Sequence, residues 1–146
     1  MNNTTIKVDE TLPINPDKSG TLPILSRDLV WDGLLLKVYD AKPFVPLMTK
    51  CVVTKEMDNG VVRNIVFDGM TLKERIIFYP KEKVEFIRVG FGDEMGTIWN
   101  EILEDRSGEL SLRFAFELEV TNLSPQEEKI YRVLPMKKRI IYWRKI

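Results

Sequence analysis

The spacing of apolar residues divides the chain into a helical stretch and a long run of strands. Between Ser26 and Pro46 apolar residues recur at intervals of three and four, the period of a helix face. Ser26 is a good N-cap residue, and Asp28 is favoured at the positive end of the helix dipole. We expect this helix to be largely buried and to end, or to break into a second short helix, at Pro43 and Pro46.

Alternating apolar and polar positions predict seven strands, one before the helix and six after it. The predicted strands are 4–14, 50–57, 61–67, 72–79, 84–89, 95–104 and 110–120. Asn59-Gly60 and Asp68-Gly69 are turn dipeptides, since both residues of such a pair accept positive φ. The last strand alternates most strictly, which predicts a mostly antiparallel sheet with one dry face and one wet face.

A second helix signal lies near the C-terminus. Ser124-Pro-Gln-Glu127 forms a capping box with proline at the first helical position. We expect a helix from Pro125 to about Leu134, an interruption at Pro135 and a second piece to Ile146.

Composition narrows the chemistry and the compartment. The chain has 146 residues, which favours one domain spanning 1–146, and its net charge is zero. It has no histidine, which excludes a Ser-His-Asp triad, a Cys-His pair and histidine metal sites. The single cysteine, Cys51, cannot form an intrachain disulfide, and we expect it to be a small packed residue. Neither a secretory signal nor an apolar stretch of about 20 residues is present, so we expect a cytoplasmic protein.

The order of elements and several local strings resemble the SRPBCC (START/Bet v allergen-like) superfamily and, within it, the small AtaL-like group. The matching strings are Leu12–Pro16, Leu25–Lys37, Phe44–Pro46, Lys73–Arg75 and Gly108–Leu118. The resemblance implies an α+β helix-grip fold. In it a curved, seven-stranded antiparallel sheet wraps a long C-terminal helix, and an apolar cavity lies between them. Superfamily members bind lipids, sterols, polyketides or other hydrophobic molecules, and some are cyclases or aromatases. Pro135 departs from the family's uninterrupted last helix.

Side chains on the expected dry face are candidates for lining a ligand cavity, because such cavities are mainly apolar with a few polar groups. The candidate ligand-binding residues are Trp31, Glu74, Phe78, Phe86, Trp99, Phe114 and Phe116. A filled core is the simpler interpretation of each aromatic residue, since most buried aromatic rings only pack.

Four polar residues of the strands form a second candidate group. They are Glu74, Arg75, Asn100 and Glu101. On a concave face they could orient a ligand or act as acid and base, whereas a surface ion pair or cross-strand pair is the simpler interpretation. Strand parity places Glu74 on the inner face and Arg75 on the outer face, and a buried Glu74 would need a partner.

Two further segments are distinctive in composition. Residues 129–146 contain seven basic side chains and no acidic one, which could suit a membrane surface or nucleic acid. The favoured interpretation is that these basic residues lie at the C-terminal end of a helix, where they complement the helix dipole and contact the acidic remainder of the protein. Residues 90–96 are rich in glycine but lack the lysine of a phosphate loop, so we expect a hairpin loop at the mouth of the cavity.

Three functional hypotheses follow. The preferred one is a non-catalytic binder of a lipid- or polyketide-like hydrophobic molecule between the sheet and the C-terminal helix, with no metal and no cofactor. The second is an enzyme of the polyketide cyclase or aromatase kind, in which Glu74, Glu101 or Tyr79 transfers protons. The third is a structural or protein-interaction domain without a ligand. We expect no nucleic-acid partner and no membrane contact, and the sequence identifies neither the ligand nor the oligomeric state.

Overall fold

The computed structural model describes residues 3–16, 19–89, 94–121, 123–126 and 128–129. The predictions for the glycine-rich loop, for the basic segment and for the interruption at Pro135 fall wholly or mostly outside these residues, and they stay predictions.

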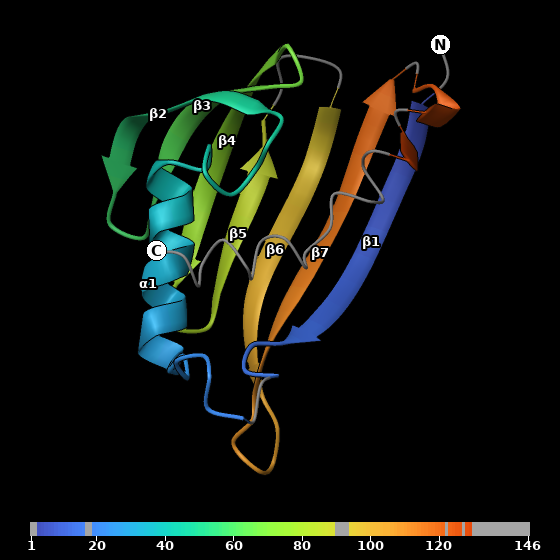
Figure 1. Ribbon diagram of the computed structural model, residues 1–146. Coiled ribbons are helices and arrows are strands. Elements are labelled where there is room, and N and C mark those ends of the chain that lie inside the picture. Colours follow the sequence, from blue (N-terminus) through green and yellow to red (C-terminus); the bar gives the residue numbers. More distant parts are fainter. Residues whose placement is uncertain (1–2, 17–18, 90–93, 122, 127, 130–146) are drawn as a thin grey trace.

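Seven strands form a single antiparallel sheet in the order β1-β7-β6-β5-β4-β3-β2. The strands are β1 (Asn3–Pro13), β2 (Met48–Met57), β3 (Gly60–Phe67), β4 (Met70–Tyr79), β5 (Lys83–Arg88), β6 (Glu94–Glu104) and β7 (Leu110–Thr121). Each predicted strand is confirmed to within two residues at either end. Figure 1 shows the strands bending around the side on which the helix α1 (Arg27–Tyr39) lies, over the half of the sheet that holds β2, β3 and β4.

The tight turns occur where the sequence predicts them, although for two different reasons. Asp68 and Gly69 both take positive φ, at 48° and 78°, as a twisted two-residue hairpin requires. Asp58 and Asn59 join β2 to β3, and Gly60 begins β3. Neither Asn59 nor Gly60 has positive φ, so the reason given for that turn is wrong. Glycine is needed at position 60 because a Cβ there would lie 1.8 Å from the carbonyl oxygen of Ile76 on the adjacent strand.

Helix α1 begins as predicted and ends earlier. The Ser26 Oγ accepts a hydrogen bond from the Leu29 amide at 3.2 Å, which confirms the N-cap. The helix ends at Tyr39, and residues 42–44 and 46–47 form turns, so the predicted second short helix is wrong. Pro43 explains this end, since it has no N–H to donate to the Tyr39 carbonyl and its ring would clash there.

A C-terminal helix begins at the predicted capping residue. The Glu128 amide donates to the Ser124 carbonyl at 2.9 Å, and residues 125–126 and 128–129 are helical. Within the described part of the chain, no helix is both long enough and apolar enough to cross a membrane.

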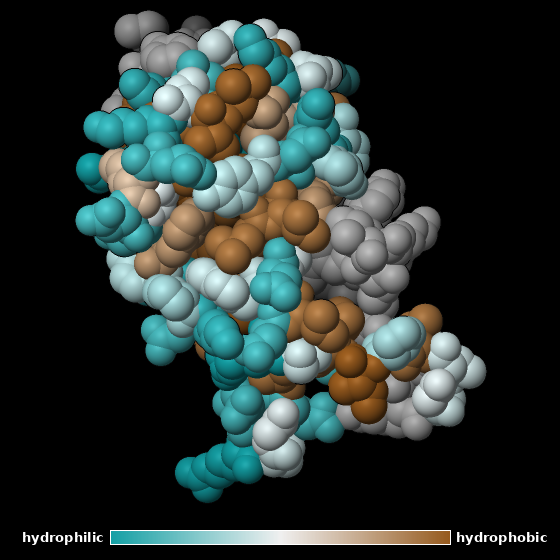
Figure 2. Space-filling model, turned by 90° about the vertical axis from the view of Figure 1, so that its left-hand side faces the viewer, coloured by the Kyte–Doolittle hydropathy of each residue, from teal (hydrophilic) through white to brown (hydrophobic). Residues whose placement is uncertain are grey.

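The apolar core lies between α1 and the concave face of the sheet. Three residues of the predicted helical stripe are buried: Val30, Leu34 and Val38. Each such aliphatic side chain contributes about 1.5–3 kcal/mol when it is fully buried. The opposite side of α1 keeps Leu29 and Leu36 half exposed. Figure 2, which views the molecule from the left-hand side of Figure 1, shows apolar surface among polar side chains. Among the buried residues of α1, Lys37 is the exception, because it is charged and only 4% exposed.

Candidate ligand-binding site

A row of three charged side chains crosses the concave face. Arg63 on β3 lies directly opposite Glu74 on β4, and Glu74 lies directly opposite Arg88 on β5. Residues that are direct partners in a sheet point to the same face, so the register itself brings the three together. All three are buried, with exposed fractions of 2%, 1% and 7%. The prediction that Glu74 points to the inner face is confirmed.

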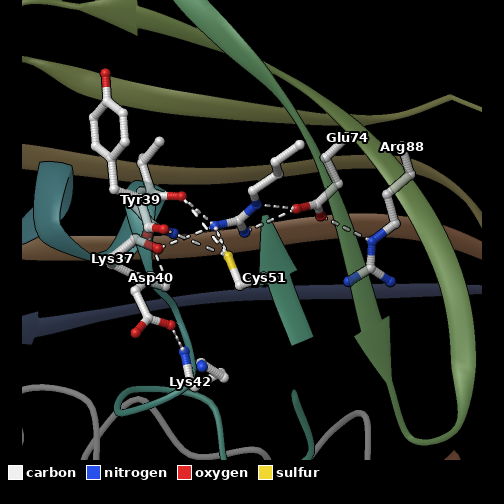
Figure 3. Close-up of polar contacts among 10 residues, drawn as sticks. Lys37, Tyr39, Asp40, Lys42, Cys51, Glu74 and Arg88 are labelled. Atoms are coloured by element: carbon white, nitrogen blue, oxygen red, sulfur yellow. Dashed lines mark hydrogen bonds and ion pairs between the residues drawn. The ribbon is translucent and has the colours of Figure 1, made fainter. Parts of the chain in front are cut away.

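Glu74 accepts one arginine at each of its carboxylate oxygens (Figure 3). The Arg63 Nε and Nη2 lie 2.9 and 2.8 Å from Oε1, and the Arg88 Nε lies 3.1 Å from Oε2. Burial by itself raises the pKa of Glu74, but the charges and hydrogen bonds of Arg63 and Arg88 outweigh burial and hold that pKa below its ordinary value. Glu74 is therefore ionised at neutral pH.

Arg63 also joins the charged row to the end of helix α1. Its Nη1 donates to the carbonyl oxygens of Lys37, at 3.0 Å, and Val38, at 2.7 Å. Carbonyls in the last turn of a helix have no intrahelical partner and form the negative end of the helix dipole, so a cation there is favourable. The same Nη1 lies 3.4 Å from the Sγ of Cys51, which is half-buried. Arg63 is thus a positioning residue that fixes α1 against the sheet.

Lys37 brings a further cation to the same region from the helix. Its ammonium donates to the Oδ1 of Asn100 at 2.7 Å, and it lies 5.4 and 5.3 Å from the ring centres of Phe86 and Phe114. Both distances are within the range of cation–π attraction. Arg88 stands in the same relation to the ring of Phe67, at 5.6 Å. The charges are therefore set among aromatic rings.

These residues line a cavity on the concave face. Its polar lining is Lys37, Arg63, Glu74 and Arg88, and its aromatic lining is Phe67, Phe86, Phe114 and Phe116. Aliphatic side chains complete the described lining: Val45, Met48, Ile98 and Leu118. The cavity encloses about 530 Å³ of space free of atoms, some of it open to solvent, and about 50 Å³ in which the centre of a water molecule can lie.

The structure brings together four of the seven candidate ligand-binding residues. Glu74, Phe86, Phe114 and Phe116 line the cavity. Trp31 and Phe78 do not, among the residues described, and instead pack edge to face with ring centres 6.5 Å apart. Whether any of these side chains contacts a ligand stays a prediction.

Trp99 is on the other face of the sheet, so its predicted place on the dry face is wrong. Its indole Nε1 donates to the Glu85 carboxylate at 3.0 Å, while the next residue, Asn100, is fully buried on the concave side. Strand parity is the reason, because neighbouring residues point to opposite faces and only one of these two can point inward. Glu101 consequently lies on the outer face with Arg113, at 3.3 Å, in the cross-strand ion pair that was the simpler interpretation.

Sequence reasoning missed the three cations of the cavity: Lys37, Arg63 and Arg88. Arg88 could have been found, because it continues the apolar positions Val84 and Phe86 at a spacing of two. Lys37 lies on the buried stripe of α1, one residue before Val38. Arg63 gave a weaker signal, since apolar residues on both faces of β3 blur its parity. A charge at an apolar position is an indication of a functional or paired residue.

The chain has a recognisable family. The model of AtaL, acetylaranotin biosynthesis cluster protein L, matches residues 8–139. The protein belongs to the AtaL family. No curated protein sequence matches it.

Solved structures show the same fold at low sequence identity, and the helix-grip prediction is confirmed. The di-domain ARO/CYC StfQ of the steffimycin biosynthetic pathway aligns with a TM-score of 0.71 and 11% identity over 97% of this chain. The chain spans 50% of the length of StfQ. The Zhui aromatase/cyclase from Streptomyces sp. R1128 aligns with a TM-score of 0.65 and 13% identity, covering 99% of this chain and 95% of Zhui. Ara h 8.0201 aligns with a TM-score of 0.58 and 10% identity, covering 99% and 97%.

Proposed function

We propose that this AtaL-family protein binds a hydrophobic small molecule in the concave cavity. The observation that carries the proposal is the cavity lining, in which four phenylalanine rings and four aliphatic side chains surround a small set of buried charges. Ligand sites have this composition, with apolar walls for affinity and a few polar groups for orientation. The structural similarity to polyketide aromatase/cyclases supports the same class of ligand.

The dimensions of the cavity favour a compact ligand. Sites for drug-sized molecules have volumes of about 300–1,000 Å³. The 530 Å³ of atom-free space includes open solvent and is not comparable with that range, whereas the 50 Å³ open to the centre of a water molecule lies well below it. A ligand of one or two rings is therefore expected, and Met48 is the lining residue whose side chain adapts most readily to it.

Catalysis of the cyclase or aromatase kind is the second candidate, because polar side chains do converge on the cavity. The proton-transfer residues expected from sequence are not assembled there, however. Glu101 and Tyr79 lie on the outer face, where the Lys83 ammonium is 4.7 Å from the Tyr79 ring centre. Glu74 is held as a carboxylate by two arginines. Binding without proton transfer is the function that this geometry supports better.

A matched pair of variants tests the binding proposal. Prodan, a neutral fluorophore built on two fused rings, should bind the wild-type protein saturably with increased emission. Ile98→Trp places an indole in the cavity and should weaken this binding at least about 10-fold, since close-packed interiors do not accept extra volume without strain. Ile87→Trp is the control, because Ile87 lies on the outer face of β5 and is similarly half-buried.

Native mass spectrometry of freshly purified protein is the independent measurement, and a co-purifying small molecule is the expected result. Absence of saturable fluorophore binding together with absence of a co-purifying molecule would overturn the proposal in favour of a domain without a ligand. An equal loss of binding in both tryptophan variants would remove the cavity as the site.

A further inference from the structure

Helix α1 and the segment that leads into it carry most of the large apolar side chains that are exposed in the described part of the chain. Of eight such side chains, five lie between Leu22 and Tyr39. Leu29 and Leu36 are seven residues apart, which places them on one face of the helix, and Tyr39 lies one turn beyond Leu36. These three are 54%, 50% and 45% exposed. A continuous exposed apolar stripe of this kind is typical of a contact surface.

Carboxylates lie along one side of this stripe. Asp32 is three residues after Leu29 and four before Leu36, and Asp28 lies one turn before Asp32. Both aspartates are exposed. The Lys81 ammonium lies 2.8 Å from the Asp28 carboxylate, but both side chains are more than half exposed, so this pair is weak. The outer face of α1, formed by Asp28, Leu29, Asp32, Leu36 and Tyr39, therefore suits a partner that is both apolar and basic.

The last ten residues of this chain have that composition. Residues 137–146 consist of five basic and five large apolar side chains and contain no acidic one. The basic residues are Lys137, Lys138, Arg139, Arg144 and Lys145, and the apolar residues are Ile140, Ile141, Tyr142, Trp143 and Ile146. Their charge is opposite to that of the outer face of α1, and their apolar side chains match its leucines.

The convex face of the sheet is a poorer partner for this segment, although it also carries carboxylates. Asp9 and Glu101 are both bound to Arg113, and Lys7 lies 3.9 Å from Glu117. The carboxylates of this face therefore already have cations beside them.

The chain is long enough to bring this segment to α1. Seven strands span about 29 Å at about 4.8 Å for each strand spacing. The eleven residues 130–140 can span about 36 Å when extended, which is more than the width of the sheet. Helix α1 lies over β2, β3 and β4, on the side of the sheet away from β7 (Figure 1). Pro135 breaks or kinks a helix, so it favours a change of direction just before residue 137.

We propose that residues 137–146 dock on the outer face of α1 of the same chain, with their apolar side chains on Leu29 and Leu36 and their cations beside Asp28 and Asp32. This surface does not line the concave cavity, so the inference is independent of the proposed binding of a small molecule. The contact combines apolar burial with opposite charges. It should therefore weaken but persist in about 1 M salt, where the screening length is about 3 Å.

Zero-length cross-linking of the full-length protein tests the contact. A carbodiimide joins a carboxylate to a lysine amine only where the two groups touch, and mass spectrometry identifies the joined residues. The expected products link Asp28 or Asp32 to Lys137, Lys138 or Lys145. In an equal mixture of unlabelled and ¹⁵N-labelled protein, each link should join residues of one copy.

Fluorine NMR gives an independent measurement with a matched pair of variants. In protein labelled with 5-fluorotryptophan, the Trp143 resonance, assigned with Trp143→Phe, should lie away from that of free fluorotryptophan. Leu36→Lys should move it to the free position and reduce the yield of the cross-links at least about 10-fold, since it removes apolar contact and adds a like charge. Val52→Lys is the control and should change neither, because Val52 is 45% exposed and pairs with Asn64 on the convex face.

Three results would each overturn the inference. The first is a wild-type Trp143 resonance at the free position. The second is linkage of these lysines only to convex-face carboxylates such as Glu85, Glu117 or Glu119. The third is linkage only between labelled and unlabelled copies, which would assign the outer face of α1 to a second copy of the chain.

Discussion

Two clusters of three charged residues lie on opposite faces of this sheet. In each, one central residue lies between two residues of the opposite charge. On the concave face Glu74 lies between Arg63 and Arg88, and their side chains are at most 6% exposed. On the convex face Arg113 lies between Asp9 and Glu101, whose side chains are 61% and 29% exposed. The shortest distances are similar, at 2.8 Å in the first cluster and 2.9 Å in the second.

The comparison shows that similar bond lengths carry very different energies. Exposed pairs contribute about 0.2–1 kcal/mol, because water and salt screen them. In a buried cluster the attraction between the charges offsets the cost of their desolvation only when every charge has its partner. An apolar cluster of similar volume is often as stable. The concave cluster is therefore poorly explained as a stabilising device, and its position on the wall of a cavity accords with the proposed binding function.

Glu74→Gln should have the largest effect on stability. It removes the carboxylate that both buried arginines, Arg63 and Arg88, bind, and breaking a buried pair in this way costs about 3–5 kcal/mol. Urea unfolding at about pH 7 measures the change. The control is Glu101→Gln on the convex face, which should cost less than about 1 kcal/mol. Equal losses in the two variants would remove the contrast between the clusters.

An apolar replacement of the whole concave cluster should be more stable than Glu74→Gln. The triple variant Arg63→Met, Glu74→Leu, Arg88→Met leaves no unpaired charge in the row, although it also removes the two hydrogen bonds of Arg63 to the helix carbonyls. Unfolding by urea should rank the triple variant above the single one. A triple variant less stable than Glu74→Gln would mean that the charges are structural.

Most of the fold was predictable because its signals are local. Turn dipeptides and period-two alternation placed every strand, and Ser26 and Ser124 marked both helix starts. Pro43 alone could not show that turns, rather than a second short helix, follow α1, since a proline can begin a helix as well as end one. At Gly60 the decisive contact is with the Ile76 carbonyl on another strand, which local sequence does not reveal.

The site was less predictable than the fold, because its residues depend on register between strands. Alternation along one strand identified Glu74, Phe86, Phe114 and Phe116, but not the alignment of Arg63, Glu74 and Arg88 across three strands. Trp99 was misplaced because aromatic character was given more weight than parity, although Asn100 beside it was the inward residue. Polar residues at inward positions deserved more weight than aromatic ones.

Acid should lower the stability of the wild-type protein by protonating Glu74 in the concave cluster. Glu74→Gln should remove this part of the pH dependence. The pKa of Glu74 in the folded protein is below its ordinary value of 4.5, so its contribution to stability is fully present above that value and is lost as the pH falls through the folded pKa. The stability difference between wild type and Glu74→Gln should be constant from neutral pH to somewhat above 4.5, and should then narrow on acidification. Urea unfolding at a series of pH values measures it, and a difference independent of pH down to the acid transition would contradict the assignment.

Arg113→Gln should have a smaller effect than any change to the concave cluster, although it removes three hydrogen bonds to carboxylates. Arg113 holds Asp9 through two bonds, at 2.9 and 3.0 Å, and Glu101 through one at 3.3 Å, and its hydrogen bonding keeps the pKa of Asp9 below the ordinary value. Because the Asp9 side chain is 61% exposed, solvent screening limits the loss to about 0.2–1 kcal/mol.

Salt provides the control for this last prediction. In about 1 M salt, where the screening length falls to about 3 Å, wild type and Arg113→Gln should have nearly the same free energy of unfolding. Glu74→Gln should keep most of its penalty under the same conditions, since its charges are out of reach of the ions. A loss of more than about 2 kcal/mol in Arg113→Gln, or a penalty insensitive to salt, would show that the convex cluster is energetically like the buried one, and burial would then no longer separate the two faces.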